Sequence, residues 1–368
     1  MSEKRLSRLY ALLEDAQLDA VALNPGATLT YLTGLNFHLS ERPTVLLAAR
    51  GAAPALILPD LEFSKASLSS IPLECFSYND DPVSWQNAFK EAAKALPLKH
   101  AKIGVEPTHL RILELNHLQA ALPDAKLTPA ESSLGILRIH KDKDEVEAMR
   151  AAARIAQEAL LAILPLIGPG LSEQAIAAEL TIQLLRAGAQ PDLPFTPIVA
   201  SGPNSANPHA TPGERRLQSG DLILIDWGAA VNGYCSDITR TFVIGKTDPE
   251  MGKIARVVLE ANQAGFAAAM PGAPAAAVDQ AARSVIDSAG YGAFFTHRTG
   301  HGLGMEGHEA PYIYDGSAVT LQPGMTFTIE PGIYLPGRGG VRIEDDIVIT
   351  ESGAEQLTDL PRELQIIS

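Results

Sequence analysis

The sequence predicts a two-part protein, in which an α/β domain over residues 1–130 precedes an α+β domain over residues 141–368. In the first third of the chain, helical and strand-like segments alternate at short spacing, which is typical of α/β organisation. In the remainder, long helical patterns are followed by hairpin patterns, which indicates antiparallel strands rather than a parallel barrel. The chain has 368 residues, 46% of them hydrophobic, which is enough for more than one core.

The first domain begins with an amphipathic helix over residues 5–16. Leu6, Leu9, Leu12 and Leu13 recur there at helical spacing, and no continuous apolar stretch follows, so this segment is not a signal peptide. Short apolar runs and one further helical pattern complete the domain. They predict strands at 21–23, 44–49, 55–58 and 102–105 and a helix at 84–96.

A linker is expected over residues 131–140, within and after the stretch Thr128-Pro-Ala-Glu-Ser-Ser-Leu-Gly. The segment that begins Lys141-Asp-Lys-Asp-Glu then opens a long helix, because its acidic residues lie in the first turn, where the helix dipole favours them. The second domain is built from such helices and from strands. The helices are expected at 143–163, 172–187, 249–269 and 275–289, and the strands at 221–228, 234–244, 325–334 and 341–349.

Composition excludes several classes of protein. Lys and Arg number 29 against 43 Asp and Glu, a formal net charge of −14, which argues against binding to nucleic acid or to an anionic membrane. The two cysteines, Cys75 and Cys235, are too few for a disulfide scaffold or a cysteine-rich zinc module. The longest apolar run, near residues 159–167, is broken by Pro165 and is too short to span a bilayer. A cytoplasmic protein is therefore expected.

The segment 221–243 holds the first candidate functional residues. Asn232-Gly233 is a strong signal for a two-residue hairpin turn, and this turn places position 226 opposite position 239. Asp226 and Asp237 then become diagonal neighbours on one face, within reach of a shared cation. Asp226 ends an apolar run, where an unpaired buried carboxylate is costly. The alternative is that both are ordinary acidic residues at strand ends.

A second hairpin is expected at 326–349, with residues 336–340 as its turn. Glu330 follows one apolar strand, and Glu344 lies in the returning one. The turn length is open, but an odd-length loop centred on Gly337 would place both carboxylates on one face. Pro331 ends regular strand pairing just after Glu330, which suits a side chain that is directed into a site.

A histidine-rich segment, Thr296-His-Arg-Thr-Gly-His-Gly-Leu-Gly-Met-Glu-Gly-His, lies between the two hairpins. Its glycines at 302, 304 and 307 spell G-x-G-x-x-G. The strand–turn–helix context of a dinucleotide-binding fold is missing, however, as is the acidic residue that should follow. The glycines more plausibly let the backbone carry His301 and His308 close to a ligand.

The candidate residues together suit divalent metal ions. Four carboxylates and one imidazole, with no thiolate, fit two ions such as Mn, Co or Zn. Two such ions can activate water and polarise the carbonyl that the water attacks. The sequence contains neither the H-E-x-x-H motif of mononuclear zinc peptidases nor the G-x-S-x-G nucleophile motif.

These residues, in this order and context, resemble the metal-ligand set of the pita-bread metallopeptidases, family M24. Within this family the chain is similar to the proline-specific branch, the Xaa-Pro aminopeptidases and Xaa-Pro dipeptidases (prolidases). The resemblance covers the whole chain and implies a creatinase-like N-terminal domain followed by a pita-bread catalytic domain. The implied metal ligands are Asp226, Asp237, His301, Glu330 and Glu344.

The resemblance also implies roles for the site residues. Asp237 and Glu344 would bridge two ions, and Glu330 resembles the general base of the family. His209, in Ser201-Gly-Pro-Asn-Ser-Ala-Asn-Pro-His, and His308 resemble the histidines that hold the substrate and stabilise the tetrahedral intermediate. From the residues alone, His209 could equally be a loop surface residue. Arg342 resembles an arginine that supports the site, and Thr239, on the hairpin face of the two aspartates, is expected to contact a ligand.

A further resemblance concerns the loop Tyr31-Leu-Thr-Gly-Leu-Asn-Phe-His-Leu-Ser-Glu-Arg-Pro. In related enzymes this loop comes from the neighbouring subunit of a dimer and contacts the substrate, which makes His38, Glu41 and Arg42 candidates for that role here. An exposed polar loop is the alternative. The resemblance thus implies a homodimer whose N-terminal domain lies near the active site of its partner.

Two peptidase activities are open. Some short prolidases carry an arginine four residues after the second histidine, where this chain has Tyr312. Because tyrosine cannot neutralise the carboxylate of a dipeptide, the sequence favours an Xaa-Pro aminopeptidase, with an Xaa-Pro dipeptidase as the alternative. Arg338 or Arg42 could supply the missing charge and reverse this choice. A metal-free pita-bread protein that binds peptides and a methionine aminopeptidase are less favoured, because the ligand set is intact and the N-terminal domain is present.

Overall fold

The computed structural model describes residues 2–246 and 248–367. The chain forms two compact units, one up to Arg138 and one from Ile139 onward, and each is described by itself. Helix α6 (Glu131–Ile139) ends at the boundary of the two units. It covers most of residues 131–140, for which the sequence predicted a linker, so this segment is helical.

The N-terminal unit is a single mixed sheet with helices. The strands lie in the order β4-β3-β2-β1-β5-β6, and three of the five pairings are parallel: β1 with β5, β3 with β4 and β5 with β6. An α/β class is therefore observed, as predicted. The strands are β1 (Ala20–Leu23), β2 (Val45–Ala49), β3 (Ala55–Pro59), β4 (Glu74–Tyr78), β5 (Lys102–Val105) and β6 (Lys126–Pro129). The helices before α6 are α1 (Ser2–Asp15), α2 (Ala27–Thr33), α3 (Phe63–Ala66), α4 (Pro82–Ala95) and α5 (Ile112–Ala121).

One core of the N-terminal unit lies between one face of the sheet and helices α4 and α5. Strands β1, β2 and β3 are buried along their whole length, which explains why they read as continuous apolar runs. Phe89 of α4 and Leu118 of α5 pack against them. Helix α4 begins where the Asp81 side chain accepts the N–H of Val83 and Pro82 takes the first helical position.

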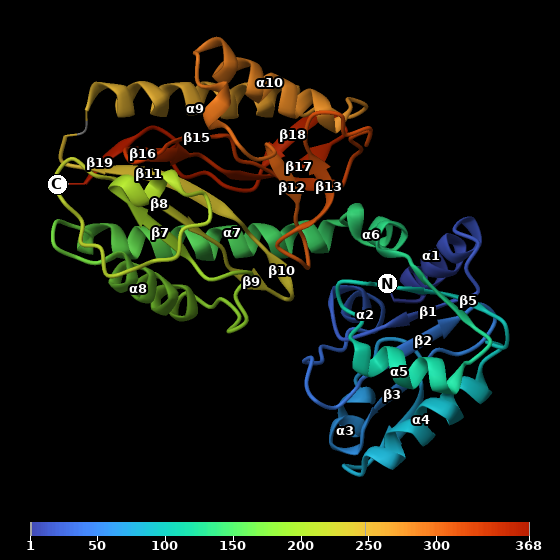
Figure 1. Ribbon diagram of the computed structural model, residues 1–368. Coiled ribbons are helices and arrows are strands. Elements are labelled where there is room, and N and C mark those ends of the chain that lie inside the picture. The colour runs from blue at the N-terminus through green and yellow to red at the C-terminus, as the bar shows by residue number, and fades with distance from the viewer. Residues whose placement is uncertain (1, 247, 368) are drawn as a thin grey trace. The chain divides into compact units, whose positions relative to one another are not determined.

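The C-terminal unit consists of antiparallel sheets between two helix pairs (Figure 1). The helices are α7 (Lys143–Ile163), α8 (Glu173–Arg186), α9 (Pro249–Ala268) and α10 (Ala275–Ser288). The long helix predicted here is observed as α7, with Asp144 and Glu145 in its first turn, and Asp142 and Glu145 form a reciprocal capping box there. One core packs α7 and α8 against the strands around Trp227, and another packs α9 and α10 against those around Ile333.

Two larger sheets run through this unit. One has the order β19-β11-β8-β7, and the other has the order β13-β12-β14-β17-β18. Among the described strands of this unit, every pairing is antiparallel except that of β11 with β19. The strands are β7 (Ile198–Ser201), β8 (Leu222–Trp227), β9 (Ala230–Val231), β10 (Tyr234–Cys235), β11 (Ile238–Ile244), β12 (Gly300–Gly302), β13 (Glu309–Ile313), β14 (Thr326–Ile329), β15 (Gly332–Leu335), β16 (Gly339–Arg342), β17 (Asp345–Thr350), β18 (Gly353–Gln356) and β19 (Gln365–Ile367). The short helix η3 (Gly202–Ala206) follows β7 directly.

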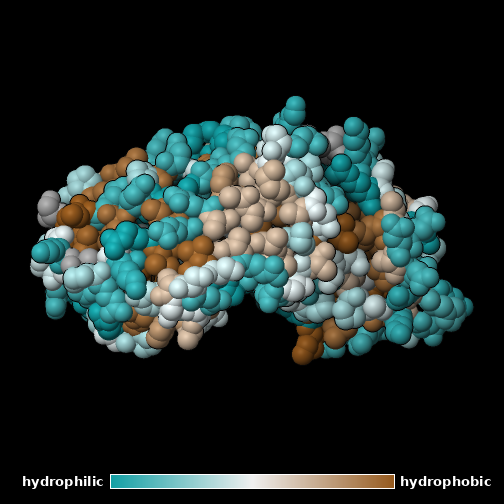
Figure 2. All heavy atoms as spheres, turned by 90° about the horizontal axis from the view of Figure 1, so that it is seen from above, coloured by the Kyte–Doolittle hydropathy of each residue, from teal (hydrophilic) through white to brown (hydrophobic). Residues whose placement is uncertain are grey.

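The exposed surface is of mixed character. Figure 2 views the molecule from the side on which α9 and α10 lie in Figure 1 and shows a contiguous, mildly apolar area near the centre, surrounded by hydrophilic residues and smaller apolar groups. Among the described residues, no helix is both long enough and apolar enough to cross a membrane. Cys75 and Cys235 are both free thiols.

Candidate metal centre and reaction cavity

The first hairpin places Asp226 in the predicted register. β8 pairs antiparallel with β11, and Asp226 lies opposite Thr239. The turn residues Asn232 and Gly233 both have positive φ, 51° and 78°, as a type I′ turn requires. The pairing predicted from Asn232-Gly233 is thus confirmed, and Asp226 lies near the end of a fully buried strand.

Asp237 lies between β10 and β11, and its carboxylate is grouped with that of Asp226. The chain packs so closely on Gly228 that a Cβ there would lie 2.0 Å from the carbonyl oxygen of Ser236. The backbone N–H of Asp237 donates to both carboxylate oxygens of Asp346, at 3.2 and 3.0 Å. Because Asp346 is fully buried in β17, it fixes the backbone that carries Asp237.

The second hairpin brings Glu330 and Glu344 together. Leu335 pairs with Gly339, so the turn spans residues 336–338 and is centred on Gly337, which has a φ of 74°. The pairing of β14 with β17 continues the same register. Glu330 and Glu344 occupy the gaps on the two sides of the hairpin, between β14 and β15 and between β16 and β17. The odd-length turn therefore places both carboxylates on one face.

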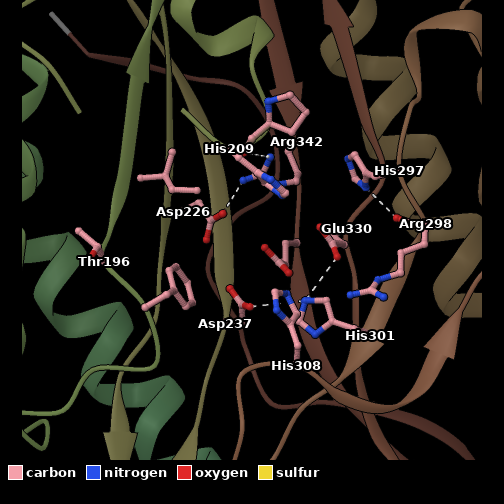
Figure 3. A pocket seen from close by; sticks show the side chains of 14 residues that line it. Thr196, His209, Asp226, Asp237, His297, Arg298, His301, His308, Glu330 and Arg342 are labelled. Carbon is pink, nitrogen blue, oxygen red and sulfur yellow. Dashed lines mark hydrogen bonds and ion pairs between the residues drawn. The ribbon is translucent and has the colours of Figure 1, made fainter. Parts of the chain in front are cut away.

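His301 joins the carboxylates from β12. Its Nε2 lies 3.5 Å from Oε1 of Glu330 and 3.7 Å from Oδ2 of Asp237, as Figure 3 shows. The His308 ring meets the His301 ring edge-on, with centroids 3.9 Å apart. Burial lowers the pKa of His301 well below its ordinary value, so its imidazole is neutral, the form that binds metals.

These side chains fit a metal centre. Three overlapping groups have donor atoms within 4.8 Å of one another; they are Asp226–Asp237–Glu344, His301–Glu330–Glu344 and Asp237–His301–His308. The five predicted ligands therefore lie in one cluster, which His308 adjoins. The Oδ1 atoms of Asp226 and Asp237 are buried and have no hydrogen-bond partner among the described residues, which suits the binding of a cation. A donor set of carboxylates and imidazole suits a divalent ion.

The electrostatics of the cluster also call for added positive charge. Burial raises the pKa of Glu330 to about 7. Burial first, and then the charges of neighbouring carboxylates, raise the pKa values of Asp237 and Glu344 well above their ordinary values. Without a cation, burial and mutual repulsion favour the protonated forms of these carboxylates.

Arg342 is a buried cation at the edge of the cluster. Its Nη2 donates to Asp226 at 2.5 Å, and its Nε donates to the Thr239 hydroxyl at 3.1 Å. Thr239 in turn donates to Oε2 of Glu344 at 2.6 Å. Arg342 and Thr239 therefore contact carboxylates from both hairpins. Such contacts are expected of an arginine that supports the site and of a threonine that contacts a ligand.

His297, Arg298 and Tyr334 complete the surroundings of the cluster, and sequence reasoning did not single them out. Nδ1 of His297 lies 2.7 Å from the Arg298 carbonyl oxygen, so Nδ1 carries the proton. Nε2 then accepts from the Tyr334 hydroxyl at 2.8 Å. Burial lowers the pKa of His297 to about 4. The many histidines in residues 296–308 indicated a functional segment, but nothing in the sequence distinguished His297 from the neighbouring histidines.

The cluster forms one wall of a cavity of about 510 Å³. His209 and His308, both exposed, lie on this cavity, as Figure 3 shows. The other lining residues are apolar, polar or charged: Phe195, Thr196, Ile198, Pro208, Asp226, Asp237, His297, Arg298, His301, Glu330, Arg342 and Glu344. The cavity thus joins the candidate metal centre to imidazole donors and to apolar side chains.

The remaining candidates lie elsewhere. Tyr312, on β13, is 40% exposed and is not among the described residues that line the cavity. Its ring is covered by the guanidinium of Arg298, 4.4 Å from the ring centroid. His38 is exposed on the N-terminal unit, where Arg42 forms ion pairs with Glu41 and Asp80. The contacts expected of His38 and Arg42 with substrate stay predictions.

Known proteins resemble the chain over its whole length. Residues 147–351 match the model of metallopeptidase family M24, and residues 5–140 match that of the creatinase/prolidase N-terminal domain. An Xaa-Pro dipeptidase of Lactobacillus helveticus is 35% identical over 98% of each chain. The crystal structure of a dipeptidase from Pyrococcus horikoshii is 40% identical, with a TM-score of 0.92 over 98% of this chain and 99% of that one. An X-Pro aminopeptidase from Thermotoga maritima is 31% identical, with a TM-score of 0.85 over 98% and 99%.

The two-unit fold and the buried carboxylate–histidine cluster define a metal-dependent hydrolase. The chain belongs to metallopeptidase family M24 and carries the creatinase/prolidase N-terminal domain. The predicted fold is thereby confirmed, with a pita-bread catalytic domain in the C-terminal unit. The protein is a metallopeptidase, and the metal-free reading no longer applies.

Proposed function

We propose that the protein is an Xaa-Pro dipeptidase, which hydrolyses the bond before proline in dipeptides. This proposal replaces the aminopeptidase that the sequence favoured. That choice rested on Tyr312, which cannot supply positive charge for the carboxylate of a dipeptide. The names of similar proteins, including the 40%-identical dipeptidase, support the alternative better than the aminopeptidase.

The observation that carries the proposal is the position of Arg298 on the cavity wall. Its guanidinium stacks on Tyr312 and forms no ion pair with a carboxylate in the described parts of the chain. A free C-terminal carboxylate is a natural partner for such a cation. Arg338, by contrast, is already paired with Asp248 and Glu250. Arg298 therefore takes the role for which Tyr312 is unsuited.

The other roles follow from the cluster. Asp226, Asp237, His301, Glu330 and Glu344 would hold two divalent ions, of which Mn, Co and Zn suit these donors. Such ions polarise a carbonyl and make water a better nucleophile.

The remaining chemistry falls to side chains around the substrate. Glu330 accepts a proton from the attacking water, and His209 and His308 donate hydrogen bonds to the peptide carbonyl as charge develops on its oxygen. Arg342 keeps Asp226 in place. A homodimer whose His38 and Arg42 approach the partner's cavity, and a cytoplasmic location, remain part of the proposal.

The test compares substrates that differ only at the C-terminus. The metal-loaded protein is assayed with an Xaa-Pro dipeptide, the same dipeptide as its amide, and an Xaa-Pro-Xaa tripeptide. A dipeptidase cleaves the free dipeptide far faster than the other two. Equal or faster cleavage of the tripeptide would restore the aminopeptidase reading.

The role of Arg298 is tested in the same assay. Arg298→Gln is expected to lower kcat/KM for the dipeptide about 10- to 100-fold, the loss typical of a hydrogen bond to a charged group. The same variant should leave the amide unaffected, and Arg298→Lys should recover part of the loss. Arg256→Gln, on the exposed face of α9, is the matched control.

A further inference from the structure

The His209 loop, defined here as residues 202–213, connects β7 with the segment that leads to β8. Most of its residues are exposed or half-buried, with Gly202, Ser205 and Ala210 buried, and it must present His209 to the cavity. Exposed loops are commonly mobile unless their ends are tied. The contacts that fix the ends of this loop therefore affect how His209 is placed.

One buried carboxylate meets both ends of the loop. Glu173, the first residue of α8, is 1% exposed. Its Oε1 accepts the backbone N–H and the hydroxyl of Ser201, both at 2.7 Å, just before the loop begins. Its Oε2 accepts the N–H of Gly213, at 3.2 Å, where the loop ends. The Nδ2 of Asn204 bridges the two oxygens, at 3.1 and 3.2 Å.

The middle of the His209 loop contacts the second hairpin. The N–H of Gly340 donates to the Ser205 hydroxyl at 2.9 Å. Nη1 of Arg342 donates to the carbonyl of Pro208, the residue before His209, at 3.3 Å. With its ends fixed by Glu173 and its middle fixed by the second hairpin, the loop has one arrangement in which His209 faces the cavity.

We propose that Glu173 is a positioning residue, whose buried carboxylate clamps both ends of the His209 loop and so holds His209 in place for substrate. This inference rests on the role of His209 in the proposed function. Glu173 is not a candidate metal ligand and does not line the cavity, so an effect on catalysis must be indirect, through the segments that Glu173 contacts.

The decisive variant is Glu173→Gln. An amide keeps one acceptor oxygen for Ser201, but its NH₂ group then faces the N–H of Gly213, so the clamp opens at one end. We expect kcat/KM for an Xaa-Pro dipeptide to fall about 10- to 100-fold, mainly in kcat, because small misplacements of a positioned group have effects of this size. Two-metal binding, measured by calorimetry, should stay as in the parent. Glu158→Gln, at an exposed position on α7, is the control and should change nothing.

A double-mutant cycle separates positioning from general stability. His209→Ala alone should lower kcat/KM about 100- to 1,000-fold, as loss of a donor to the developing charge does. If Glu173 acts through His209, adding Glu173→Gln to His209→Ala changes kcat/KM less than about threefold. Effects that multiply would overturn the proposal, as would a Glu173→Gln variant with full activity beside an impaired His209→Ala.

A readout independent of activity accompanies the kinetics. Hydrogen exchange of residues 202–213 should accelerate in metal-loaded Glu173→Gln, while α8 beyond its first turn stays protected. If hydrogen exchange of residues 202–213 were unchanged, the proposed role of Glu173 would be wrong even if kcat/KM fell. If Glu173→Gln fails to fold, Asn204→Ala, an exposed change that removes the bridging amide, should give the same pattern at about 2- to 5-fold. Full activity of His209→Ala would instead contradict the proposed function at that residue, and the positioning role with it.

Discussion

At the residue scale, Arg342 links most of the catalytic surroundings. It is 3% exposed and donates to Asp226, to the Thr239 hydroxyl, to the Tyr334 hydroxyl and to the Pro208 carbonyl. A guanidinium has five N–H donors in a fixed plane, whereas an ammonium is a compact point charge. No other side chain could serve four acceptors in these directions.

Arg342→Lys is therefore expected to be far from conservative. We predict that kcat/KM falls by more than about 100-fold, and that the free energy of unfolding falls by about 1–3 kcal/mol, because the ammonium leaves buried acceptors of the guanidinium without a donor. Kinetic assays and chemical denaturation of the metal-loaded protein provide the measurements. Arg338→Lys, at an exposed pair, is the control; comparable losses in both variants would contradict the assignment.

Tyr334 carries a second prediction at this scale. Its hydroxyl donates to His297 and accepts from Arg342, and the residue is 4% exposed. Tyr334→Phe removes the donor to Nε2 of the half-buried His297 and one acceptor of the buried Arg342, which typically lowers the free energy of unfolding by about 1–3 kcal/mol. Tyr314→Phe, at 48% exposure, should be close to neutral in the same denaturation experiment. Equal stability of the two variants would show that His297 and Arg342 find other partners.

At the scale of elements, the close packing of β16 on η3 is the tightest constraint on the second hairpin. A Cβ at Gly340 would lie 2.3 Å from the Ser205 carbonyl oxygen, and backbone cannot move aside as a flexible side chain would. Gly340→Ala should therefore lower the free energy of unfolding by about 1–3 kcal/mol and reduce activity through the His209 loop. Gly252→Ala, inside α9 with open space around it, should instead raise the free energy of unfolding by about 0.5–1 kcal/mol. Thermal or chemical unfolding of both variants measures these changes. The prediction is wrong if the free energy of unfolding changes in the same direction in both.

Elements with strong local signals were predictable from the sequence. Asn232-Gly233 determined the register of the first hairpin, and apolar runs located β1, β2, β3 and β5. Helix α5 was missed because its apolar residues form no single buried face: Ile112 is 74% exposed, and Glu114 is fully buried. Helix α6 read as a linker because Gly135 and two serines weaken its helical pattern.

The candidate site, too, was predictable from the sequence only where local signals exist. The five ligand candidates lie on hairpins whose registers the sequence could indicate, and the structure brings them into one cluster. The partners of Glu173 and the stacking of Arg298 on Tyr312 depend on segments far apart in the chain. Residues related only by tertiary packing leave no spacing pattern, so sequence reasoning did not consider Arg298 and named only Arg338 and Arg42 as residues that could supply this charge.

At the scale of the whole molecule, the net charge of −14 includes carboxylates that the fold has buried together. Asp226, Asp237, Glu344 and Glu330 lie within one cluster, where their mutual repulsion is opposed by Arg342 and, in the metalloenzyme, by divalent ions. The stability of the protein should therefore depend on metal and on pH together.

The sign of this dependence follows from the raised pKa values. Glu330 has a pKa of about 7 in the folded, metal-free chain, against an ordinary value of 4.5. The folded chain then binds more protons than the unfolded chain between pH 4.5 and 7, so the free energy of unfolding falls as pH rises through this window. Glu330 alone contributes up to about 3 kcal/mol. Asp237 and Glu344, whose pKa values are also raised, act in the same direction.

We predict that removal of metal by a chelator lowers Tm more at pH 7.5 than at pH 5. His297 has the opposite sign, because its pKa is lowered to about 4, so its stabilising effect is lost as pH falls from 6.5 toward 4. His297 contributes equally to the metal-loaded and the metal-free protein, however. Its contribution therefore cancels in the difference in Tm between the two, which reports on the carboxylate cluster.

Calorimetric scans from pH 5 to 8, with and without Mn²⁺, measure this difference. Glu330→Gln should flatten the pH dependence of the metal-free protein, whereas Glu351→Gln, at an exposed turn, should not. A gap in Tm that is constant or narrows as pH rises would mean that the carboxylates are already neutralised by groups of the chain itself, and that the cluster does not need a cation to stay folded.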